Sequence, residues 1–365
     1  MRVSLHRATL TYGGGLVLHT AASGRVAGLD ALYLRLERDG LVAVGEVRLN
    51  IAYLNGLPAE TVLAEAVEVV GRLDFRAGAA ALLAATPAPV AQASAPVRTL
   101  IDSALHDLAA KQVDLPLAVF LGAPAEAQIA HATNQTLFVS ADDTFVEQAE
   151  AYVARGFRDL KVRIGAGDFA DDLRRIGRLR ARFGDTVKLA ADANGAWGEA
   201  AALANLEALA RHGLAYVEQP MAPGDWQALD RLARATPVPI MLDESVKGLD
   251  DVERIVQANN GLMAHLKLVK LGGIAPTLAA ARRLHTAKVP FMIGQMNEGG
   301  LATAAALHAT VAARPRFAEL YGADGLVDDP AAGLAYAEGR VAAPSAPGLG
   351  LRFDASRAHL IREFS

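Results

Sequence analysis

The sequence predicts an α/β protein, a (β/α)8 TIM-type barrel preceded by an α+β capping domain. From about residue 130 onward, short apolar runs alternate with longer amphipathic segments at a nearly even spacing. Eight such strand–helix units are what a closed parallel barrel requires. A doubly wound open sheet is the alternative. However, no glycine cluster here follows a strand in the G-x-G-x-x-G pattern of that fold.

The predicted barrel strands are short apolar runs bounded by polar or glycine-containing segments. They are Ala130–Gln135, Asp159–Arg163, Lys188–Asp192, Tyr216–Glu218, Ile240–Asp243, Ala264–Leu268, Phe291–Gly294 and Phe317–Leu320. Between them, apolar residues recur at helical spacing. The predicted helices are Ala141–Gly156, Phe169–Arg182, Glu199–His212, Trp226–Thr236, Leu249–Ala258, Ile274–Ala287 and Gly300–Val311.

The N-terminal region has a different texture, with strands first and then helices. Arg2–Tyr12 and Ala31–Arg38 carry the apolar residues of strands, and Pro58–Leu73 and Val97–Lys111 have helical spacing. The stretch Ala77–Val97 carries no charge, but it contains three prolines and mostly small side chains. Because a membrane span needs about 20 strongly apolar residues, this stretch predicts a short helix followed by a Pro-rich loop.

We expect three parts in the chain. Residues 1–125 form the α+β capping domain, and residues 126–331 form the catalytic barrel. Residues 332–365 include a short apolar stretch at Leu351–Asp354, and they are too many for a frayed end. This tail is therefore expected to return to the capping domain.

Composition excludes several classes of function. The chain has 365 residues, with 36 Lys and Arg against 40 Asp and Glu, and a formal net charge of −4. This balance argues against partners such as nucleic acid or a membrane surface. The absence of cysteine excludes disulfides and thiolate metal sites. The start of the chain also lacks the apolar core of a secretory signal, so a cytoplasmic location is expected.

Charged and amide residues gather at the predicted carboxyl ends of the strands, where such barrels carry their active sites. They are Lys161, Arg163, Asp192, Asn194, Glu218, Asp243, Glu244, Lys267 and Glu298. Carboxylates on three successive strands repel one another unless a cation holds them. Because the donors are oxygens, without Cys or a nearby His, Mg²⁺ is the expected ion, with Mn²⁺ as an alternative.

Such a site can remove the proton next to a substrate carboxylate. The charge then moves to an ene-diolate, whose oxygens the metal and the flanking cations stabilise. Lys267 is the expected base, and neighbouring cations such as Lys270 would lower its pKa. Each acid taken alone could instead cap a helix or lie on the surface. We interpret His131, His212, His265 and His308 as packed or surface histidines, because each lies in a strand or helix pattern.

Five motifs in order resemble the enolase superfamily, and within it the muconate lactonizing enzyme subgroup, which is often grouped with mandelate racemase. They are Lys161-Val-Arg163, Asp192-Ala-Asn194-Gly-Ala-Trp197, Val217-Glu218-Gln219-Pro220, Asp243-Glu244-Ser245 and Lys267-Leu-Val-Lys270-Leu-Gly272-Gly273. The segments 104–111 and 347–350 also resemble the family. The resemblance spans nearly the whole chain and implies a modified, enolase-like barrel.

The resemblance also implies roles for individual residues. Asp192, Glu218 and Asp243 would hold Mg²⁺, and Lys267 would be the acid/base. Lys161 would polarise the site, and Glu298 would lie beside the substrate. Asn194, Glu244 and Lys270 would support these groups. Loops Tyr12–Val26 and Val47–Leu57 would close over the pocket, and the expected substrate contacts are Tyr12, Tyr53, Asn134, Gln135 and Asn297.

Arg163 departs from the family pattern, which has a second lysine at this place as the opposing base. Because a guanidinium stays charged and is a poor base, Arg163 favours one-face chemistry, either β-elimination or cycloisomerisation. The alternatives are a racemase or epimerase of an amino-acid derivative or α-hydroxy acid, and a non-catalytic barrel that binds metal and carboxylate. The eighth strand lacks the Asp-x-Asp of dipeptide epimerases, since the segment is Leu320–Asp324.

The expected substrate is a small carboxylate with a partly apolar body, because the capping loops are mostly apolar. Its identity stays open at this stage. The resemblance further implies a homo-oligomer.

Overall fold

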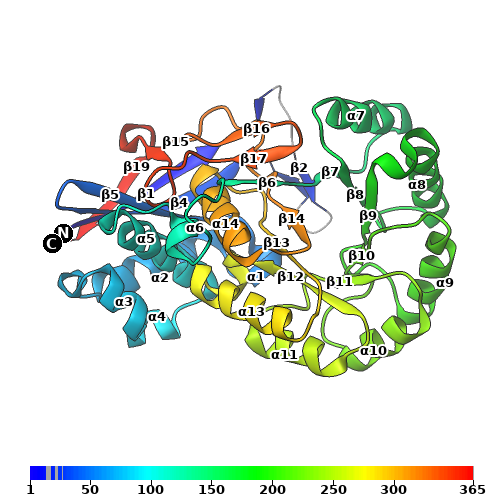
Figure 1. The fold of residues 1–365 in the computed structure, drawn as a ribbon, viewed down its shortest axis with the longest axis horizontal. Coiled ribbons are helices and arrows are strands. Elements are labelled where there is room, and N and C mark those ends of the chain that lie inside the picture. The colour runs from blue at the N-terminus through cyan, green and yellow to red at the C-terminus, as the bar shows by residue number, and fades with distance from the viewer. Residues whose placement is uncertain (14–17, 21–23, 27, 365) are drawn as a thin grey trace.

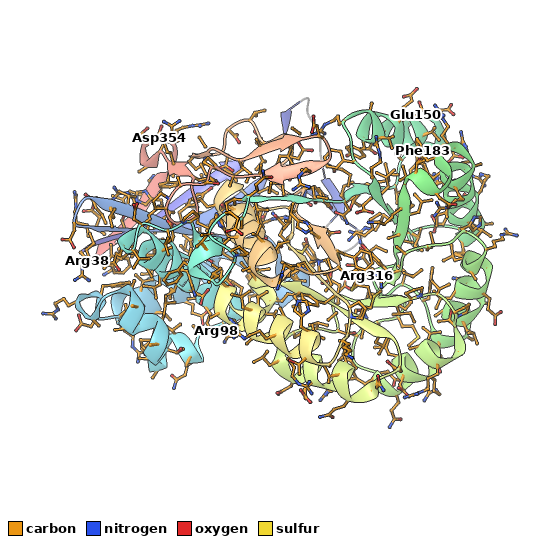
Figure 2. All side chains as sticks on the ribbon, in the orientation of Figure 1. Arg38, Arg98, Glu150, Phe183, Arg316 and Asp354 are labelled. Atoms are coloured by element: carbon orange, nitrogen blue, oxygen red, sulfur yellow. The ribbon has the colours of Figure 1, made fainter. Side chains whose placement is uncertain are left out.

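The computed structural model describes residues 1–13, 18–20, 24–26 and 28–364 (Figure 1). A ring of eight parallel strands surrounded by helices packs against an antiparallel sheet with its own helices. The two chain ends lie together on the side of the antiparallel sheet. Charged side chains such as those of Arg38, Glu150 and Asp354 point outward from the ribbon (Figure 2).

The barrel strands pair in the order of the sequence. They are β7 (Gln135–Leu137), β8 (Asp159–Arg163), β9 (Lys188–Asp192), β10 (Val217–Glu218), β11 (Ile240–Leu242), β12 (Leu262–Lys267), β13 (Phe291–Gly294) and β14 (Phe317–Glu319). Each pairs with the next in parallel, and a hydrogen bond from the Asn134 amide to the Ala318 carbonyl, at 3.2 Å, connects the last strand to the first. The predicted fold class is confirmed.

Helices follow the strands and cover the outside of the barrel (Figure 1). They are α7 (Asp142–Ala154), α8 (Phe169–Phe183), α9 (Glu199–Ala210), α10 (Trp226–Ala235), α11 (Leu249–Ala258), α12 (Leu268–Leu271), α13 (Ile274–Thr286) and α14 (Gly300–Ala313). Their inward faces are apolar, as the helical spacing in the sequence predicts. A short 3-10 turn, Gly184–Thr186, follows α8.

The first barrel strand is not where the sequence places it. The predicted run Ala130–Gln135 divides into β6 (Ala130–Ala132), which pairs with β17 outside the barrel, and β7, which begins at Gln135. The chain changes sheets at Thr133, whose amide bonds to the Gly339 carbonyl. Both halves are short and suited to strands, so the local pattern could not separate them. Likewise, β12 ends at Lys267 and Leu268 already begins α12.

The interior of the barrel is closed below the strand ends by a layer of apolar side chains. Ala190, Tyr216, Met241, Met263 and Met292 form this buried cluster. They lie in successive strands or, for Tyr216, directly before β10. Ala190, Tyr216 and Met241 precede Asp192, Glu218 and Asp243 by two residues, so each lies on the same inward face as the acid above it. The polar site above them therefore has an apolar floor.

The cap is an antiparallel sheet in the order β19 (His359–Phe364), β1 (Arg2–Leu10), β4 (Leu29–Arg38), β5 (Leu41–Arg48). Its helices are α2 (Ala59–Gly71), α3 (Ala79–Ala85), α4 (Ala88–Gln92) and α5 (Ala95–Gln112), so the expected Pro-rich loop contains a second short helix. Smaller elements are β2 (Leu18–Thr20), β3 (Gly24–Val26), α1 (Ala52–Asn55), Phe75–Ala77 and α6 (Leu117–Phe120).

The tail passes from the barrel to the cap. Its elements are β15 (Ala331–Ala332), β16 (Ala335–Ala337), β17 (Arg340–Ala342), β18 (Arg352–Phe353), Ala355–Arg357 and β19. Asp107 of α5 accepts hydrogen bonds from the Val44 amide at 2.9 Å and the Leu349 amide at 2.7 Å, which joins a cap strand, the long helix and the tail. Gly348 has a φ of 70°, and a Cβ there would overlap the Asp107 carboxylate.

Cap and barrel are also joined above the strand ends. Glu46 of β5 accepts hydrogen bonds from the amides of Gly299, Leu301 and Ala302 at the start of α14. A carboxylate suits a helix N-terminus, where free N–H groups and the helix dipole favour negative charge. This contact fixes the cap relative to the loop after β13.

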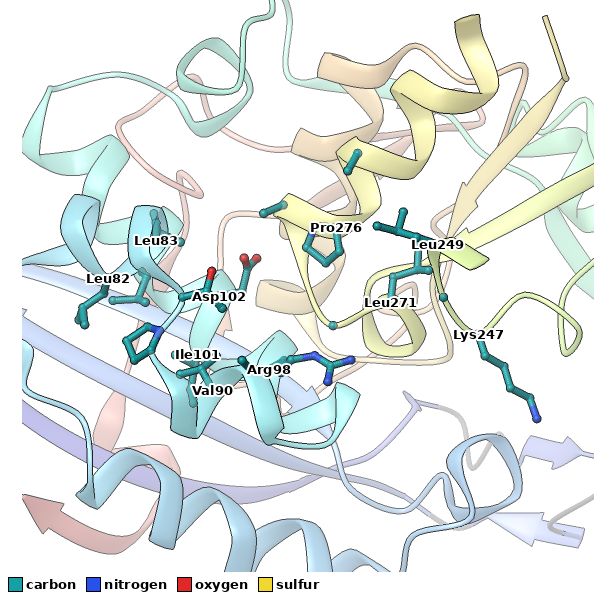
Figure 3. A pocket seen from close by; sticks show the side chains of 18 of the residues that line it. Leu82, Leu83, Val90, Arg98, Ile101, Asp102, Lys247, Leu249, Leu271 and Pro276 are labelled. Atoms are coloured by element: carbon teal, nitrogen blue, oxygen red, sulfur yellow. The ribbon is translucent and has the colours of Figure 1, made fainter. Parts of the chain in front are cut away.

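A groove separates the two domains on another side. A cavity of about 830 Å³ lies between α3, α4 and α5 of the cap and α11 and α13 of the barrel (Figure 3). Its lining includes Leu82, Leu83, Leu249 and Leu271 together with Arg98 and Asp102. In the part of the chain that is described, no helix is both long and apolar enough to cross a membrane.

Gly45 allows α5 to approach β5 closely, which leads to a stability prediction. A Cβ at this position would overlap the Leu100 carbonyl oxygen and lie 2.8 Å from the Ala104 amide nitrogen. Gly45→Ala should therefore lower the free energy of unfolding by about 1–3 kcal/mol, as overpacking does. Chemical denaturation measures this, with Gly167→Ala as control, because a Cβ at Gly167 meets nothing within 4 Å. Equal losses in the two variants would contradict the packing explanation.

Candidate active site

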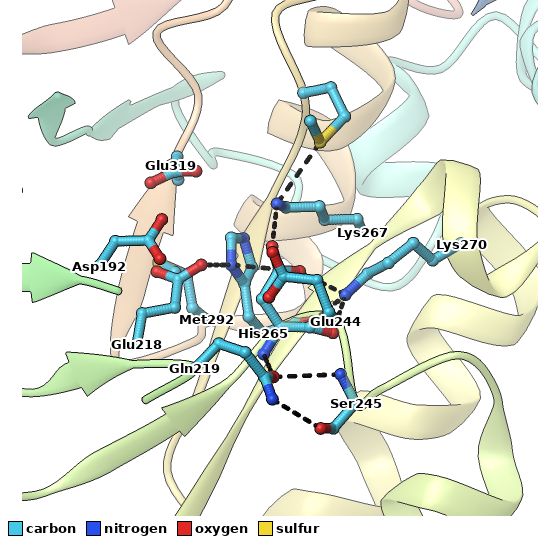
Figure 4. A network of polar contacts seen from close by, with 12 residues as sticks. Asp192, Glu218, Gln219, Glu244, Ser245, His265, Lys267, Lys270, Met292 and Glu319 are labelled. Atoms are coloured by element: carbon cyan, nitrogen blue, oxygen red, sulfur yellow. Dashed lines mark hydrogen bonds and ion pairs between the residues drawn. The ribbon is translucent and has the colours of Figure 1, made fainter. Parts of the chain in front are cut away.

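The carboxyl ends of the barrel strands open into a cavity of about 390 Å³. It is lined by Tyr53, Leu54, Phe138, Lys161, Arg163, Asp192, Asn194, Pro223, Asp243, Glu244, Lys247, Lys267, Gln295, Met296, Asn297, Glu319 and Tyr321. Tyr53 and Leu54 come from α1 of the cap, and the rest come from strand ends and the loops that follow them. Figure 4 shows the polar network beneath this cavity.

Three buried carboxylates occupy consecutive strand ends. Asp192 and Glu218 are the last residues of β9 and β10 and stand opposite each other in the parallel pairing. Asp243 directly follows β11. Burial, opposed by Lys161 but assisted by Asp192 and Glu319, raises the pKa of Glu218 to about 8. Burial also raises the pKa of Asp243, but Lys267 and Lys270 outweigh it and hold that pKa well below its usual value.

Lysines neutralise these acids. The Lys161 ammonium lies 3.1 Å from Glu218 Oε2 and 3.5 Å from Asp192 Oδ2, and it also pairs with Glu319. Lys267 donates to Asp243 Oδ2 at 2.6 Å. Lys270 donates to the Asp243 carbonyl at 2.6 Å and to its Oδ1 at 2.5 Å. An unpaired buried charge is strongly unfavourable, so this pairing is what keeps the cluster together.

The protonation of Lys267 differs from the expectation. Burial by itself lowers the pKa of Lys267, but Asp243, Glu319 and Glu218 raise it above its usual value. It is Lys270 whose pKa is lowered, because burial outweighs its pairing with Asp243. The sequence places cations near Lys267 but does not show that carboxylates lie closer.

Arg163 is tied to a carboxylate. Its Nη1 donates to Asp192 Oδ2 at 2.8 Å, while its buried Nε has no hydrogen-bond partner. Burial lowers the pKa of Arg163, but Asp192 more than compensates and raises it above the usual value. A guanidinium in this position stays protonated.

Sequence reasoning missed three residues of the cluster. Glu319 ends β14, and its oxygen accepts hydrogen bonds from Lys161 and from Asn134 Nδ2. His265 Nδ1 lies 3.0 Å from Glu218 Oε1. Gly294 on the next strand leaves space for this ring, because a Cβ there would overlap His265 Nε2. Two signals could have found them: Glu319 is a strand-end acid, and His265 precedes Lys267 by two residues and so shares its face.

The third missed residue, Gln219, holds the ends of β10 and β11 together. Its Nε2 donates to Ser245 Oγ and to the Met221 carbonyl, both at 2.8 Å. Its Oε1 accepts from the amides of Asp243 and Ser245, both at 3.1 Å. The side chain thus fixes the backbone that carries Asp243, as Figure 4 shows.

Some predicted site residues lie elsewhere. Asn134 bonds to Glu319, and Gln135 donates to Asp324 at 2.8 Å, so neither lines the cavity. The Tyr12 hydroxyl donates to the Gly322 carbonyl and accepts from Asn297 Nδ2 at 2.8 Å, also outside the cavity. In this structure the side chains of these three residues link elements of the fold, and their contact with a substrate stays a prediction. Their polar groups bond across the junction between the first and last strands and the adjoining cap, which the sequence order does not reveal.

The contacts of three other predicted features, Glu298, Glu244 and the capping loops, are as follows in the structure. Glu298 is buried beside the cavity without lining it, and burial raises its pKa to about 7. Glu244 accepts from Asn194 Nδ2 at 2.9 Å, and its buried Oε2 has no hydrogen-bond partner among the described residues. Of the loops expected to close the pocket, Tyr53 does line the cavity, whereas residues 14–17, 21–23 and 27 lie outside the described residues.

The residues present fit a divalent cation. Among the described residues, Glu218, Asp243 and His265 form a group whose ligand atoms all lie within 4.8 Å of one another. Asp192 stands beside Glu218 in the pairing. Burial and the nearby carboxylates of Asp192 and Glu319 raise the pKa of Glu218, and a cation bound beside it would oppose this shift. Oxygen donors of this kind favour a hard cation.

A barrel with this arrangement at its strand ends defines a class of metal-assisted enzyme, and the comparisons agree. A family model described as enolase C-terminal domain-like matches residues 144–357. The chain belongs to the enolase superfamily and is an enzyme of its muconate lactonizing and mandelate racemase group. The resemblance to the enolase superfamily that the sequence shows is confirmed.

Relatives of more than one activity match the chain. L-Ala-D/L-Glu epimerase of Bacillus subtilis (strain 168) is 31% identical over 260 residues, 70% of each chain. Chloromuconate cycloisomerase of Pseudomonas putida is 32% identical over 260 residues, again 70% of each. A solved structure of a dipeptide epimerase from Methylococcus capsulatus, complexed with Mg and a dipeptide, has 27% identity and a TM-score of 0.86. It covers 96% of this chain and 99% of that one.

Removal of a carboxylate tests the metal site. Asp192→Asn should weaken Mg²⁺ binding at least about tenfold, because even outer groups of metal sites contribute that much. Isothermal titration calorimetry measures the affinity. Asp159→Asn is the matched control, since Asp159 begins β8 at the opposite end of the barrel. Unchanged affinity in Asp192→Asn would show that Asp192 is not a ligand.

Proposed function

We propose that this enzyme uses Mg²⁺ to remove the proton α to a substrate carboxylate and then completes a β-elimination or a cycloisomerisation. The observation that carries the proposal is the opposition of Lys267 on β12 and Arg163 on β8 across three buried carboxylates. Of these two cations, only the lysine can act as a base. Mn²⁺ is an alternative ion.

Asp192, Glu218 and Asp243 would hold the metal. A bound Mg²⁺ supplies a Lewis acid that attracts the substrate carboxylate and stabilises charge on its oxygens. Lys267 stays protonated as long as its ammonium pairs with the Asp243 carboxylate, which lies 2.6 Å away. A cation held by Asp243 would weaken this support, so that Lys267 would release its proton to solvent and could then accept the α-proton of the substrate.

The other cations stabilise the product of proton removal. Lys161 is buried among Asp192, Glu218 and Glu319 and is held in a fixed position. Its ammonium and the Arg163 guanidinium line the cavity, where they can attract an anionic substrate and the ene-diolate. Asn194, Glu244 and Lys270 position these groups.

Epimerisation is the second candidate function, and the names of relatives favour it. The relatives described above include epimerases of dipeptides. Epimerisation needs a proton donor or acceptor on each face of the substrate carbon, and Arg163 is held charged by Asp192. For this reason we place one-face chemistry first.

Three further features belong to this proposal. The functional unit is a homo-oligomer that acts in the cytoplasm on a small carboxylate. The chain divides into a cap (residues 1–125), a catalytic barrel (126–331) and a returning tail (332–365). Tyr53 and Asn297, which line the cavity, contact the substrate, and Glu298 supports the loop beside it.

Proton exchange in D₂O tests the proposal. With Mg²⁺ and a panel of α-substituted carboxylates of both configurations, proton NMR should show loss of the α-proton in one configuration only, with elimination or cyclisation. Lys267→Ala should slow this exchange by about 10²–10⁴-fold, the usual contribution of a general base. Lys288→Ala is the control, because Lys288 is exposed at the opposite end of the barrel, before β13.

The same measurement separates the alternatives. Arg163→Lys supplies a titratable group on the second face, so exchange in the other configuration should appear. Deuterium in both configurations of the unaltered protein, with inversion, would establish the epimerase instead. Ligand-induced stabilisation without exchange over the whole panel would favour a barrel that binds and does not catalyse.

A further inference from the structure

His265 lies on β12, two residues before Lys267, and its side chain is completely buried. Met263, which belongs to the apolar floor of the barrel, precedes it by another two residues. All three side chains therefore share the inward face of the strand, and His265 lies between the floor and the charged strand ends. It does not line the cavity, so it is placed to act through its neighbours instead of on a substrate.

The imidazole contacts Glu218, which stands two strands away. His265 Nδ1 lies 3.0 Å from Glu218 Oε1, across the interior between β12 and β10 (Figure 4). The other oxygen of Glu218, Oε2, accepts a hydrogen bond from the Lys161 ammonium at 3.1 Å. Asp243 Oδ1 is 3.8 Å from Nδ1, which is too far for a hydrogen bond. Glu218 is therefore held at both oxygens, by His265 at Oε1 and by Lys161 at Oε2.

The surroundings of the ring indicate which nitrogen carries the proton. Glu218 is ionised when it binds a cation, and a carboxylate only accepts hydrogen bonds, so Nδ1 is the donor. Nε2 is buried and has no hydrogen-bond partner among the described residues. A proton on Nε2 would be a buried donor without an acceptor, which is unfavourable. The ring is accordingly a neutral donor with its proton on Nδ1.

The same observation argues against a direct bond from the imidazole to the metal. Glu218, Asp243 and His265 are close enough together to hold an ion between them. However, a histidine that binds a metal through one nitrogen nearly always donates the other N–H to a carboxylate, a carbonyl or water. The described residues provide no such acceptor at Nε2.

Gly294 on the neighbouring strand β13 provides the space for this ring. A Cβ at Gly294 would overlap His265 Nε2 and lie 3.1 Å from its Cε1. The ring therefore occupies the space in which the side chain of any other residue at position 294 would lie. The contact with Glu218 thus depends on both positions, because a side chain at 294 would displace the imidazole.

A neutral donor suits this place better than a further cation. Lys161, Lys267 and Lys270 already bring positive charge to the buried carboxylates. Another charged group beside Glu218 would compete with a divalent ion for the same oxygens. A neutral imidazole orients the carboxylate without this competition, and hydrogen-bond partners of metal ligands contribute to the affinity of a site.

We propose that His265 is a positioning residue of the metal site, whose Nδ1–H holds Glu218 Oε1 so that the carboxylate is oriented for Mg²⁺, while the imidazole itself does not bind the ion. The inference rests on the proposed function, in which Glu218 is a metal ligand. It also gives Gly294 a role, because this glycine provides the space that the ring needs.

Nitrogen NMR of the imidazole tests the assignment of the proton. The signals of His265 in the ¹⁵N-labelled protein are identified by their absence in His265→Asn. With saturating Mg²⁺, Nδ1 should be protonated and Nε2 unprotonated. A ring that binds the ion through Nδ1 would carry its proton on Nε2 instead, and this result would overturn the proposal.

Magnesium affinity, measured by calorimetry, tests the role of the hydrogen bond. His265→Leu removes the donor and should weaken Mg²⁺ binding by about 10–100-fold. His265→Asn places an amide nitrogen as many bonds from the backbone as Nδ1, so it should bind Mg²⁺ nearly as tightly as the unaltered protein. His359→Leu is the matched control, because it makes the same exchange at an exposed position of β19. Unchanged affinity in His265→Leu, or equal losses in His265→Leu and His265→Asn, would overturn the proposal.

Gly294→Ala tests the same contact from the neighbouring strand. The added methyl group should displace the ring and weaken Mg²⁺ binding in the otherwise unaltered protein. In His265→Asn, whose shorter side chain lacks Cε1 and Nε2, the same change should weaken binding less, since the two positions are in contact. Circular dichroism verifies that each variant is folded. Equal losses in both backgrounds would contradict the role of Gly294.

Glu218→Gln separates a failure of this inference from a failure of the proposed function. If Glu218→Gln weakens Mg²⁺ binding and His265→Leu does not, the metal site stands and the role of His265 is wrong. If neither change affects Mg²⁺ binding, Glu218 is not a ligand, and the proposed metal site is wrong together with the inference that rests on it.

Discussion

The mutual neutralisation of buried charges at the strand ends is the constraint on which the site depends. Asp192, Glu218, Asp243 and Glu319 are excluded from water and would destabilise the fold if they were unpaired. Lysines from β8, β12 and α12 approach them and reduce this cost. The barrel therefore has to hold its strands in one register, because a slip of one residue would turn these side chains outward.

The same cluster joins structure to chemistry. Charges that are paired and held rigidly can be redistributed when a cation and an anionic substrate enter, without a large rearrangement of the protein. The pairing of Lys267 with Asp243 keeps this lysine protonated, so in the proposed reaction Lys267 releases that proton before it accepts the α-proton of the substrate. Gln219 bonds to both Asp243 and Ser245, so the end of β11 and the loop that follows it are positioned together.

The cap takes part in the site as well as covering it. Glu46 binds the amides at the start of α14, and Arg48 donates to the Asn297 carbonyl at 3.1 Å. Through these contacts the loop after β13 is held beside Tyr53 of the cap. Residues distant in the chain thereby form one wall of the cavity.

Most of the barrel and the acids at its strand ends could be predicted from the sequence by itself, because strand periodicity and strand-end position are local properties. The strand-end place of Lys267, the departure at Arg163 and the family resemblance followed in the same way. Only the tertiary structure decided that Ala130–Gln135 divides between two sheets and that nearby carboxylates raise the pKa of Lys267. These depend on which side chains meet across the barrel and which carboxylates are already occupied, and contacts between distant residues leave no local pattern in the sequence.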